Sequence, residues 1–292
     1  MTPEQDAEVS TALLAYWTAR DEARLAQEGR GSKDVGGRAD VTKGGHLDRI
    51  AQLLGRTCIE AGAPVHEVYY KAPKDDPNRR ANISNMLTLP GYFRPTKNWD
   101  LVVYHDREPV IAIELKSQNG PSYGNNANNR AEEAIGNAVD LSKACKAGLL
   151  RRPWTGYVFV IEDDEMSRRT ESGRGKIGTQ RPDPIFTGWS YVRRVELLCN
   201  RLVEAKHYDS AWAVATSRPA CPAGPDADLE KQREKCAQFA VNKKVIPEPH
   251  EHNFAWNEPA SEVGYVQFID ALAAEVKKYD WSRPAGEQRP HR

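Results

Sequence analysis

The sequence predicts an α/β fold, a three-layer α/β/α domain built around a central mixed β-sheet. Between residues 99 and 216, strand and helix patterns follow one another in the order strand, strand, helix, strand, helix, strand. Two of these strands, Gly156–Glu162 and Ala211–Thr216, are almost continuously apolar, which is typical of strands covered on both faces. The chain has 292 residues, 39% of them hydrophobic, so it is long enough to bury the core of such a domain.

Two helices are expected before the sheet. Apolar residues recur at near-helical spacing over Thr11–Glu28, and the glycine-rich segment Gly29–Gly45 interrupts this pattern. Helical spacing returns over His46–Ala61, and Gly62 followed by Pro64 ends it. We therefore expect two helices joined by a loop.

A hairpin and a third helix are expected next. The strands Trp99–His105 and Val110–Lys116 are separated by a short turn-rich segment. After a Gly- and Asn-rich loop, Asn129 is placed to cap a helix, with Glu132 at the capping-box position and Gly148 at its end. The predicted buried stripe of this helix is Ala131, Ala134, Ile135, Ala138, Leu141 and Cys145.

The remainder of the chain divides at residue 218. A helix is expected over Val192–Ala205, between the two buried strands. From Arg218 to Pro249 the composition becomes rich in Pro, Asp and Lys, and a last amphipathic helix is expected over Glu262–Tyr279. We expect residues 1–218 to form the main domain and residues 219–292 to form an extension whose helix packs on that domain.

Composition excludes some classes of function and leaves others open. Lys and Arg together number 41, as do Asp and Glu, so an interaction with nucleic acid cannot depend on net charge and must depend on local clusters. No segment approaches the roughly 18 apolar residues that cross a bilayer, so we expect no membrane partner. Five irregularly spaced cysteines indicate reduced thiols and a cytoplasmic location. A zinc site formed by Cys221, Cys236, His250 and His252 is an alternative, although the cysteines lack close pairing.

The second strand of the predicted hairpin carries the most informative pattern. Its two-residue period places Ile111, Ile113 and Leu115 on one face, and Glu114 and Lys116 together on the other. A carboxylate and an ammonium group thus project side by side from a strand whose opposite face is apolar.

A second carboxylate is expected to join them. In the first strand Asp100 alternates with apolar residues, so pairing of the two strands can bring it close to Glu114. Hydrolysis of a phosphodiester needs hard oxygen ligands for Mg²⁺ and a group that positions or deprotonates water. We expect Asp100 and Glu114 to bind Mg²⁺, the backbone carbonyl of Leu115 to serve as a further ligand, and Lys116 to act on the water.

A plainer interpretation remains for this pattern, because cross-strand Glu/Lys pairs are common on half-exposed hairpins. Two observations favour the catalytic one. The carboxylates emerge from strongly apolar strands, where charge is costly unless it is paired or bound to metal. A loop rich in Gly and Asn follows Lys116 directly.

These motifs resemble a known family. The Asp100, Glu114 and Lys116 pattern is similar to the PD-(D/E)xK nuclease motif. The stretches 15–24, 87–100 and 114–136 resemble the XhoI restriction endonuclease family, and the likeness extends over about residues 11–216. One departure is that Pro90 does not directly precede the metal-binding aspartate. The resemblance implies a restriction-endonuclease-like fold with the three-layer architecture predicted above.

The resemblance also implies an activity. A member of this family is expected to be a prokaryotic homodimer that cleaves both strands of double-stranded DNA at CTCGAG with Mg²⁺, leaving a 5′ overhang. A twofold-symmetric site suits a twofold-symmetric protein, because each subunit then contacts one half-site. A cognate DNA methyltransferase is the implied genetic partner. The wider superfamily often takes an accessory acid from the preceding helix, and Glu60 is the candidate here.

Two segments are candidate DNA contacts. The first follows the catalytic strand, where amide and arginine side chains can pair with base edges; its candidates, with one lysine before Asp100, are Lys97, Asn119, Tyr123, Asn125, Asn126 and Arg130. The second is the basic segment 167–181, whose candidates are Arg168, Arg169, Arg174 and Lys176. The alternatives are a turn with a helix cap for the first segment and a solvated loop for the second.

Two other functions fit the same pattern. A structure-selective or repair nuclease of the same fold would cut branched or damaged DNA instead of producing discrete plasmid fragments. A DNA-binding module that uses the fold only for recognition would bind a specific sequence without product. The presence of all three core residues favours cleavage.

Overall fold

The computed structural model describes residues 1–28, 45–120, 123–170, 183–218 and 255–282. Its helices of eight residues or more are α1 (Pro3–Glu28), α3 (Asp48–Glu60), α4 (Tyr123–Lys146), α6 (Tyr191–Glu204) and α8 (Tyr265–Val276). Its shorter helices are α5 (Glu165–Arg168) and the 3-10 turns η1 (Gly45–Leu47), η2 (Val65–Glu67), η3 (Ile83–Leu87), η4 (Pro184–Phe186) and η5 (Ser261–Val263). None of the helices in these ranges is both long and apolar enough to cross a membrane.

A six-stranded mixed sheet lies at the centre, in the order β1-β4-β5-β6-β7-β8. The strands are β1 (Val68–Tyr70), β4 (Leu101–His105), β5 (Glu108–Gln118), β6 (Trp154–Glu162), β7 (Ser210–Thr216) and β8 (Trp256–Asn257). β4 and β5 form an antiparallel hairpin, β5, β6 and β7 are mutually parallel, and β8 is antiparallel at the far edge. The predicted α/β class and mixed sheet are confirmed.

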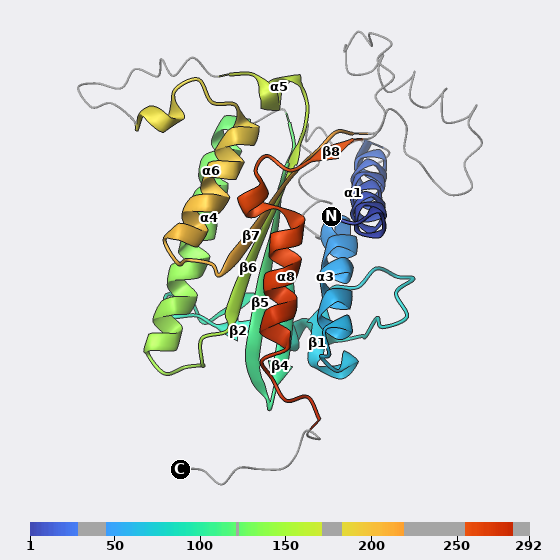
Figure 1. The fold of residues 1–292 in the computed structure, drawn as a ribbon, viewed down its shortest axis with the longest axis vertical. Coiled ribbons are helices and arrows are strands. Elements are labelled where there is room, and N and C mark those ends of the chain that lie inside the picture. The colour runs from blue at the N-terminus through green and yellow to red at the C-terminus, as the bar shows by residue number, and fades with distance from the viewer. Residues whose placement is uncertain (29–44, 121–122, 171–182, 219–254, 283–292) are drawn as a thin grey trace.

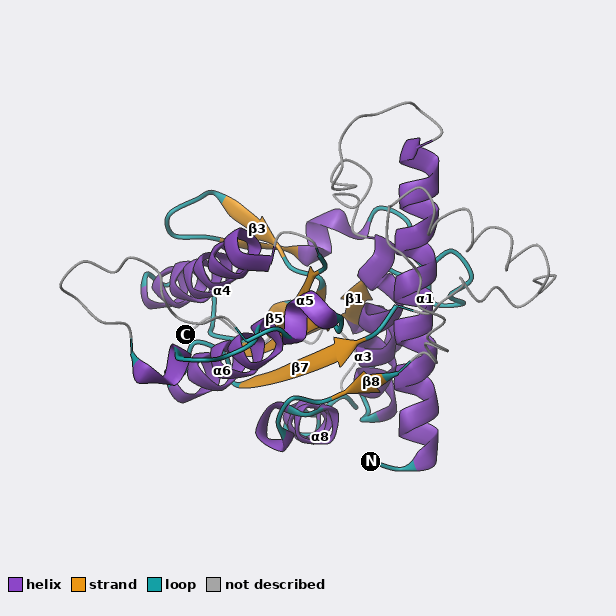
Figure 2. Cartoon of the chain, turned by 90° about the horizontal axis from the view of Figure 1, so that it is seen from above, coloured by secondary structure: helices purple, strands orange, loops and turns teal. Residues whose placement is uncertain are grey.

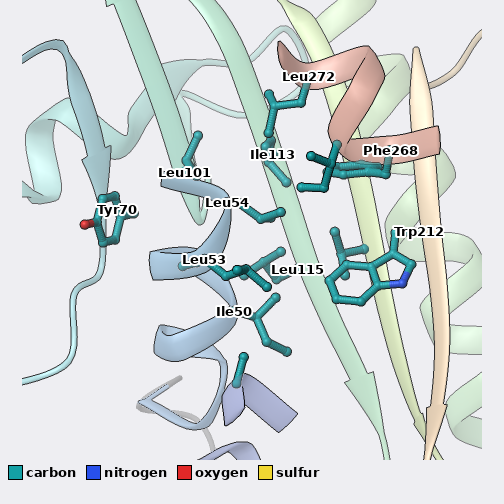
Figure 3. Close-up of a cluster of buried hydrophobic side chains, with 14 of the residues drawn as sticks. Ile50, Leu53, Leu54, Tyr70, Leu101, Ile113, Leu115, Trp212, Phe268 and Leu272 are labelled. Carbon is teal, nitrogen blue, oxygen red and sulfur yellow. The ribbon is translucent and has the colours of Figure 1, made fainter. Parts of the chain in front are cut away.

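Helices cover both faces of the sheet (Figure 1). α4 and α6 pack on one face, and α1, α3 and α8 pack on the other. Figure 3 shows the second face: Ile113 and Leu115 of β5 point toward Leu54 of α3 and Phe268 of α8. Alternate residues of the same strands, such as Ala112, belong to the core beneath α4 and α6. Side chains at even positions of β5 therefore lie on the α4 face.

A small second sheet lies beside the main one. Its two antiparallel strands are β2 (Thr88–Pro90) and β3 (Thr96–Asn98). Viewed from above, β3 lies next to α4, on the side of the central sheet opposite α8 (Figure 2). β3 runs almost directly into Asp100, so this hairpin forms one wall of the region that contains the predicted catalytic residues.

The C-terminal part of the described chain joins the same layers. β8 pairs with the end of β7, and α8 packs on the sheet through Phe268 and Leu272, both of which are fully buried. α8 lies in front of the sheet in Figure 1. The central sheet therefore contains strands that precede residue 219 in the sequence and one strand, β8, that follows it.

Several predicted boundaries need correction. α4 begins at Tyr123, not at Asn129, so neither Asn129 nor Glu132 caps it. Ile135, expected in the buried stripe, is 43% exposed. The first helix begins at Pro3 and not at Thr11. The short strands β1, β2, β3 and β8 were not predicted.

Candidate active site

The middle of β5 places a buried carboxylate beside an ammonium group. Glu114 is 1% exposed and lies on the α4 face of the sheet. The Nζ atom of Lys116, two residues along the same face, lies 2.5 Å from Glu114 Oε1. The two-residue period of the strand thus brings these side chains together, as its sequence pattern predicted.

Asp100 reaches the same point from the neighbouring strand. It lies one residue before β4, and its backbone N–H donates to the carbonyl of Ile113 at 3.1 Å. Its side-chain Oδ2 accepts the backbone N–H of Leu115 at 2.7 Å. Asp100, Glu114 and Lys116 therefore converge at the open end of the β4–β5 hairpin.

A second ammonium group, that of Lys97, completes the cluster. Its Nζ lies 2.6 Å from Glu114 Oε2, and its side chain is only 11% exposed. The same Nζ donates to the carbonyl of Asn98 and lies 5.0 Å from the centroid of the Trp99 ring. Lys97 was expected to contact DNA from the surface. The structure places it inside the acid cluster, where both Glu114 oxygens accept from lysines.

The two carboxylates of this cluster differ in their electrostatic environment. Burial raises the pKa of Asp100 to about 6, and the charge of Glu114 adds to this effect. Burial also acts to raise the pKa of Glu114, but the ammonium groups of Lys97 and Lys116 outweigh it, so that pKa lies below its ordinary value. Among the residues that the structure describes, no Lys, Arg or His forms an ion pair with Asp100. The charge of Asp100 is therefore less compensated than that of Glu114.

A third acid approaches from α3. Burial raises the pKa of Asp48, the first residue of α3, to about 7; Lys71 opposes this shift and the charge of Asp100 adds to it. Asp48 and Asp100 therefore lie within electrostatic range of each other. Glu60, the predicted accessory acid, is the last residue of α3 and is exposed, about 18 Å along the helix from Asp48. The structure brings Asp48, and not Glu60, toward the cluster.

The oxygen atoms available here suit a hard divalent cation such as Mg²⁺. Asp100 and Glu114 supply carboxylates. In a strand the N–H and C=O of one residue point to the same edge, so the carbonyl of Leu115 faces the edge where Asp100 lies. If the β4–β5 ladder of hydrogen bonds continued past Asp100, the backbone N–H of Trp99 would donate to β5. It donates instead to the carbonyl of Leu87. Lys116 and Lys97 offset the charge of Asp100 only in part, since its pKa stays raised, and this is a further reason why a cation fits.

No softer metal site competes with it in the described ranges. They contain no group of three or more His, Cys, Asp or Glu residues arranged to hold a metal ion. The alternative zinc ligands Cys221, Cys236, His250 and His252 lie outside the described residues.

A hydrogen-bonded chain leads away from Glu114 toward the β2–β3 turn. Asn137 of α4 donates from Nδ2 to Glu114 Oε1 at 3.2 Å. Its Oδ1 accepts from Arg94 at 2.6 Å, and Arg94 Nε donates to Asp140 at 2.8 Å. Both Asn137 and Asp140 are buried. Glu114 is thus connected through Asn137 to Arg94 in the β2–β3 turn.

Of the candidate DNA contacts after β5, two lie in the interior. Asn119 is buried and accepts the hydroxyl of Tyr16 at 2.5 Å. Tyr123 is 2% exposed, and its hydroxyl donates to Asp164 at 3.0 Å. Because these side chains stabilise the start of α4 and the end of β5, they present no free surface to DNA.

Other candidates lie at the surface or outside the described chain. Asn125 is exposed and Asn126 half-buried on the first turns of α4, and Arg130 is paired with Glu133 on the same helix. Arg168 is exposed but paired with Asp163, and Arg169 is exposed. Arg174 and Lys176 lie outside the described residues.

Sequence reasoning missed Asp48, Asn137 and Asp140. One signal was available for Asn137, because helical periodicity places residues 130, 133 and 137 on one face, beside the catalytic strand. Asp48 had no such signal, since only the packing of α3 against the sheet brings its first turn toward β4.

Known proteins similar to this chain are type II restriction enzymes. The family model described as restriction endonuclease XhoI matches residues 26–228. The type II restriction enzyme XhoI of Xanthomonas vasicola is 38% identical over 203 residues, which cover 68% of this chain and 76% of that enzyme. The type II restriction enzyme BstVI of Geobacillus stearothermophilus is 36% identical over 200 residues, or 64% of this chain and 80% of that enzyme. AbrI of Azospirillum brasilense, also a type II restriction enzyme, is 42% identical over 156 residues, or 52% and 64%. No solved structure matches the chain.

Proposed function

Because the chain belongs to the XhoI restriction endonuclease family, we propose that it cleaves both strands of DNA at a palindromic site with Mg²⁺. Membership makes it a type II restriction endonuclease, a site-specific deoxyribonuclease whose partner is DNA. The finer proposal is cleavage within CTCGAG to leave a 5′ overhang. The observation that carries the proposed chemistry is the convergence of Asp100, Glu114 and Lys116 beside α4.

In the proposed site, Asp100, Glu114 and the carbonyl of Leu115 would hold Mg²⁺. When bound, the ion would polarise the phosphate and stabilise the negative charge that develops on it. Lys116, 23% exposed, orients the attacking water and stabilises it as it loses its proton. The water oxygen bonds to phosphorus as one P–O bond to the sugar breaks; the proton lost by the water passes to solvent, and solvent protonates the departing sugar oxygen. Burial strengthens each of these electrostatic interactions, because the surrounding core excludes solvent.

Asp48 and Lys97 have supporting roles in this proposal. Asp48 is the proposed accessory acid in place of Glu60, because it begins α3 at the end nearer the cluster and the charge of Asp100 contributes to its raised pKa. Lys97 balances the charge of buried Glu114. Because both Glu114 oxygens already accept from lysine ammonium groups, a cation that binds Glu114 competes with these groups for the same carboxylate.

Digestion of plasmid DNA tests the proposed cleavage. Wild-type protein should produce discrete fragments with Mg²⁺ and none with a chelator, and sequencing the fragment ends should give CTCGAG with a 5′ overhang. Glu114→Gln and Lys116→Met should abolish cutting. Glu108→Gln is the matched control, because Glu108 is an exposed residue at the start of the same strand. Intact plasmid with the wild type, or undiminished cutting by Glu114→Gln, would refute the proposal.

Digestion of branched DNA and a gel-shift measurement, beside the plasmid assay, separate the two rival functions. Cleavage of branched or damaged DNA without discrete plasmid fragments would indicate a structure-selective nuclease. A sequence-dependent gel shift with Mg²⁺ and no product would indicate a binding module.

The proposed assembly is a homodimer, because a twofold site is cleaved most simply by two copies that each contact one half-site. Sedimentation in the presence of a CTCGAG duplex should give two protein chains per duplex. A cognate methyltransferase is proposed as the genetic partner, so DNA methylated within CTCGAG should resist cutting.

A further inference from the structure

The turn between β2 and β3 presents two aromatic rings to solvent. Tyr92 is 53% exposed and Phe93 is 70% exposed, the highest fraction for a large hydrophobic residue in the part of the chain that the structure describes. Their ring centroids lie 5.0 Å apart at an interplanar angle of 82°, so each ring supports the other edge to face. Neither ring belongs to either hydrophobic core. Core packing therefore does not account for them.

A buried carboxylate holds this turn in one conformation. Asp140 of α4 is 4% exposed, and its Oδ1 accepts the backbone N–H groups of Tyr92 at 2.8 Å and Phe93 at 2.7 Å. Its Oδ2 accepts Arg94 Nε at 2.8 Å. These bonds lower the pKa of Asp140 although burial opposes them, so the carboxylate stays ionised. Charge-assisted bonds of this kind are among the stronger hydrogen bonds in proteins.

Glycine at position 91 is needed for this arrangement. A Cβ there would lie 2.5 Å from Asp140 Oδ2 and 2.6 Å from the carbonyl of Arg94. The turn can approach the carboxylate only because that Cβ is missing.

The aromatic turn is tied to the proposed catalytic cluster along two routes. Arg94 bonds to Asn137, which bonds to Glu114. β3, which leaves the turn, carries Lys97, whose ammonium contacts Glu114. A phosphate bound at Glu114 would therefore lie within a few side-chain lengths of the turn. DNA is about 20 Å wide, so a duplex at Glu114 has to pass close to the exposed side chains of the β2–β3 hairpin.

We propose that Tyr92 and Phe93 form an aromatic wedge that packs against the bases next to the cleaved phosphodiester, and that Asp140 positions this wedge relative to Glu114. This inference rests on the proposed function. Apolar side chains inserted at a base step kink DNA, and aromatic rings stack on bases of any sequence. The side chain of Arg94, 42% exposed beside the rings, adds a cation that suits the phosphate backbone.

Binding and fluorescence measurements test the wedge. A CTCGAG duplex carrying 2-aminopurine beside the cleaved bond, with Ca²⁺ replacing Mg²⁺ to prevent cutting, should brighten when wild-type protein unstacks the probe. Phe93→Ala should weaken binding about 10-fold and reduce that brightening, because stacking on one base is lost. The slope of affinity against salt concentration should stay the same, since no phosphate contact is removed. Leu149→Ala is the control, as Leu149 is 54% exposed in the loop that follows α4.

A double-mutant cycle tests the positioning role of Asp140. Asp140→Asn keeps the shape of the side chain and removes its charge, so the turn should lose its fixed position. On this background, Phe93→Ala should cost much less affinity than in the wild type. Equal losses on both backgrounds would contradict the positioning role.

The outcomes distinguish the wedge from the proposed function. If the wild type cuts plasmid but Phe93→Ala has wild-type affinity and fluorescence, the wedge is wrong and the nuclease proposal stands. If Phe93→Ala changes the oligomeric state and leaves DNA affinity unaltered, the rings form a subunit contact, which also overturns the wedge. A wild type that neither binds nor cuts DNA overturns both.

Discussion

Among individual residues, the buried charge of Asp100 is expected to lower the stability of the fold. Its pKa rises from an ordinary value of 3.8 to about 6, chiefly because it is buried. Between these two values the folded chain binds more protons than the unfolded chain, so this group's contribution to stability falls as pH rises through that window. Above pH 6 the ionised carboxylate destabilises the metal-free fold by on the order of 1–3 kcal/mol.

Asp100→Asn should remove that cost. In chelator at pH 8, denaturant unfolding should show the variant to be more stable than the wild type, and the difference should shrink toward pH 4. Asp270→Asn, at an exposed position of α8, is the control and should change little. A variant less stable than the wild type at pH 8 would mean that the charge of Asp100 is already compensated in the folded protein.

Lys97 offers a second prediction for a single side chain. Its ammonium shares Glu114 with Lys116, so in the metal-free protein it competes with any cation that binds there. Lys97→Met should lower the Mg²⁺ concentration that gives half-maximal thermal stabilisation by about tenfold, which corresponds to 1.4 kcal/mol. Lys277→Met, which changes an exposed lysine at the end of α8, should leave that concentration unaltered. An increase in the Mg²⁺ required would show that Lys97 assists cation binding.

The two-residue period of β5 was enough to predict that Glu114 and Lys116 share a face, since it depends only on local backbone geometry. The position of Asp100 followed from hairpin pairing. Lys97 was predicted to contact DNA because it is a basic residue just before Asp100. The ammonium of Lys97 points toward Glu114 because β3 pairs with β2 in the small sheet. That sheet has little apolar pattern in the sequence.

Among helices, two glycines should respond in opposite directions to the same substitution. In α3, a Cβ at Gly55 would lie 2.4 Å from the ring of Tyr70, whose hydroxyl is bonded to buried Asp76. In α4, a Cβ at Gly136 would have no neighbour within 4 Å. Alanine favours a helix over glycine by roughly 1 kcal/mol, and overpacking a core costs about 1–3 kcal/mol.

Gly136→Ala should therefore raise the free energy of unfolding by up to about 1 kcal/mol. Gly55→Ala should lower it, because displacement of the Tyr70 ring outweighs the gain in helix propensity. Urea unfolding of the two variants beside the wild type measures both. Stabilisation by Gly55→Ala would show that α3 can move away from β1 without loss of packing.

The start of α4 shows what local patterns could not predict. Asn and Gly residues at 124–129 are typical of turns, which favoured a helix beginning at Asn129. Tertiary contacts at Tyr123 override that preference: its backbone carbonyl accepts from Gln118, and its ring stacks on Tyr191 at 5.4 Å. The longer strands and helices were predictable because each buries a periodic apolar face. β1 and β8, with three and two residues, are too short to show a period.

For the whole molecule, the question is whether the chain after residue 218 is needed by the nuclease fold. Phe268 is fully buried, and its ring lies 5.8 Å from that of Trp154. A Cβ at Gly156 of β6 would lie 2.7 Å from the Phe268 ring, so this ring packs directly on the sheet backbone. α8 thus covers the face of β6 and β7 that α1 and α3 leave open.

We therefore predict that a chain ending at residue 254 does not fold, because it lacks both β8 and α8 and exposes the apolar faces of β6 and β7 to water. A chain ending at residue 282 keeps every described element and serves as the control. Phe268→Ala, which removes one ring from the intact chain, should lower the free energy of unfolding by about 3–5 kcal/mol. Circular dichroism and urea unfolding of the three proteins provide the measurement. A stable, cooperative fold for the chain ending at 254 would show that residues 1–218 are an autonomous domain on which α8 is only an accessory layer.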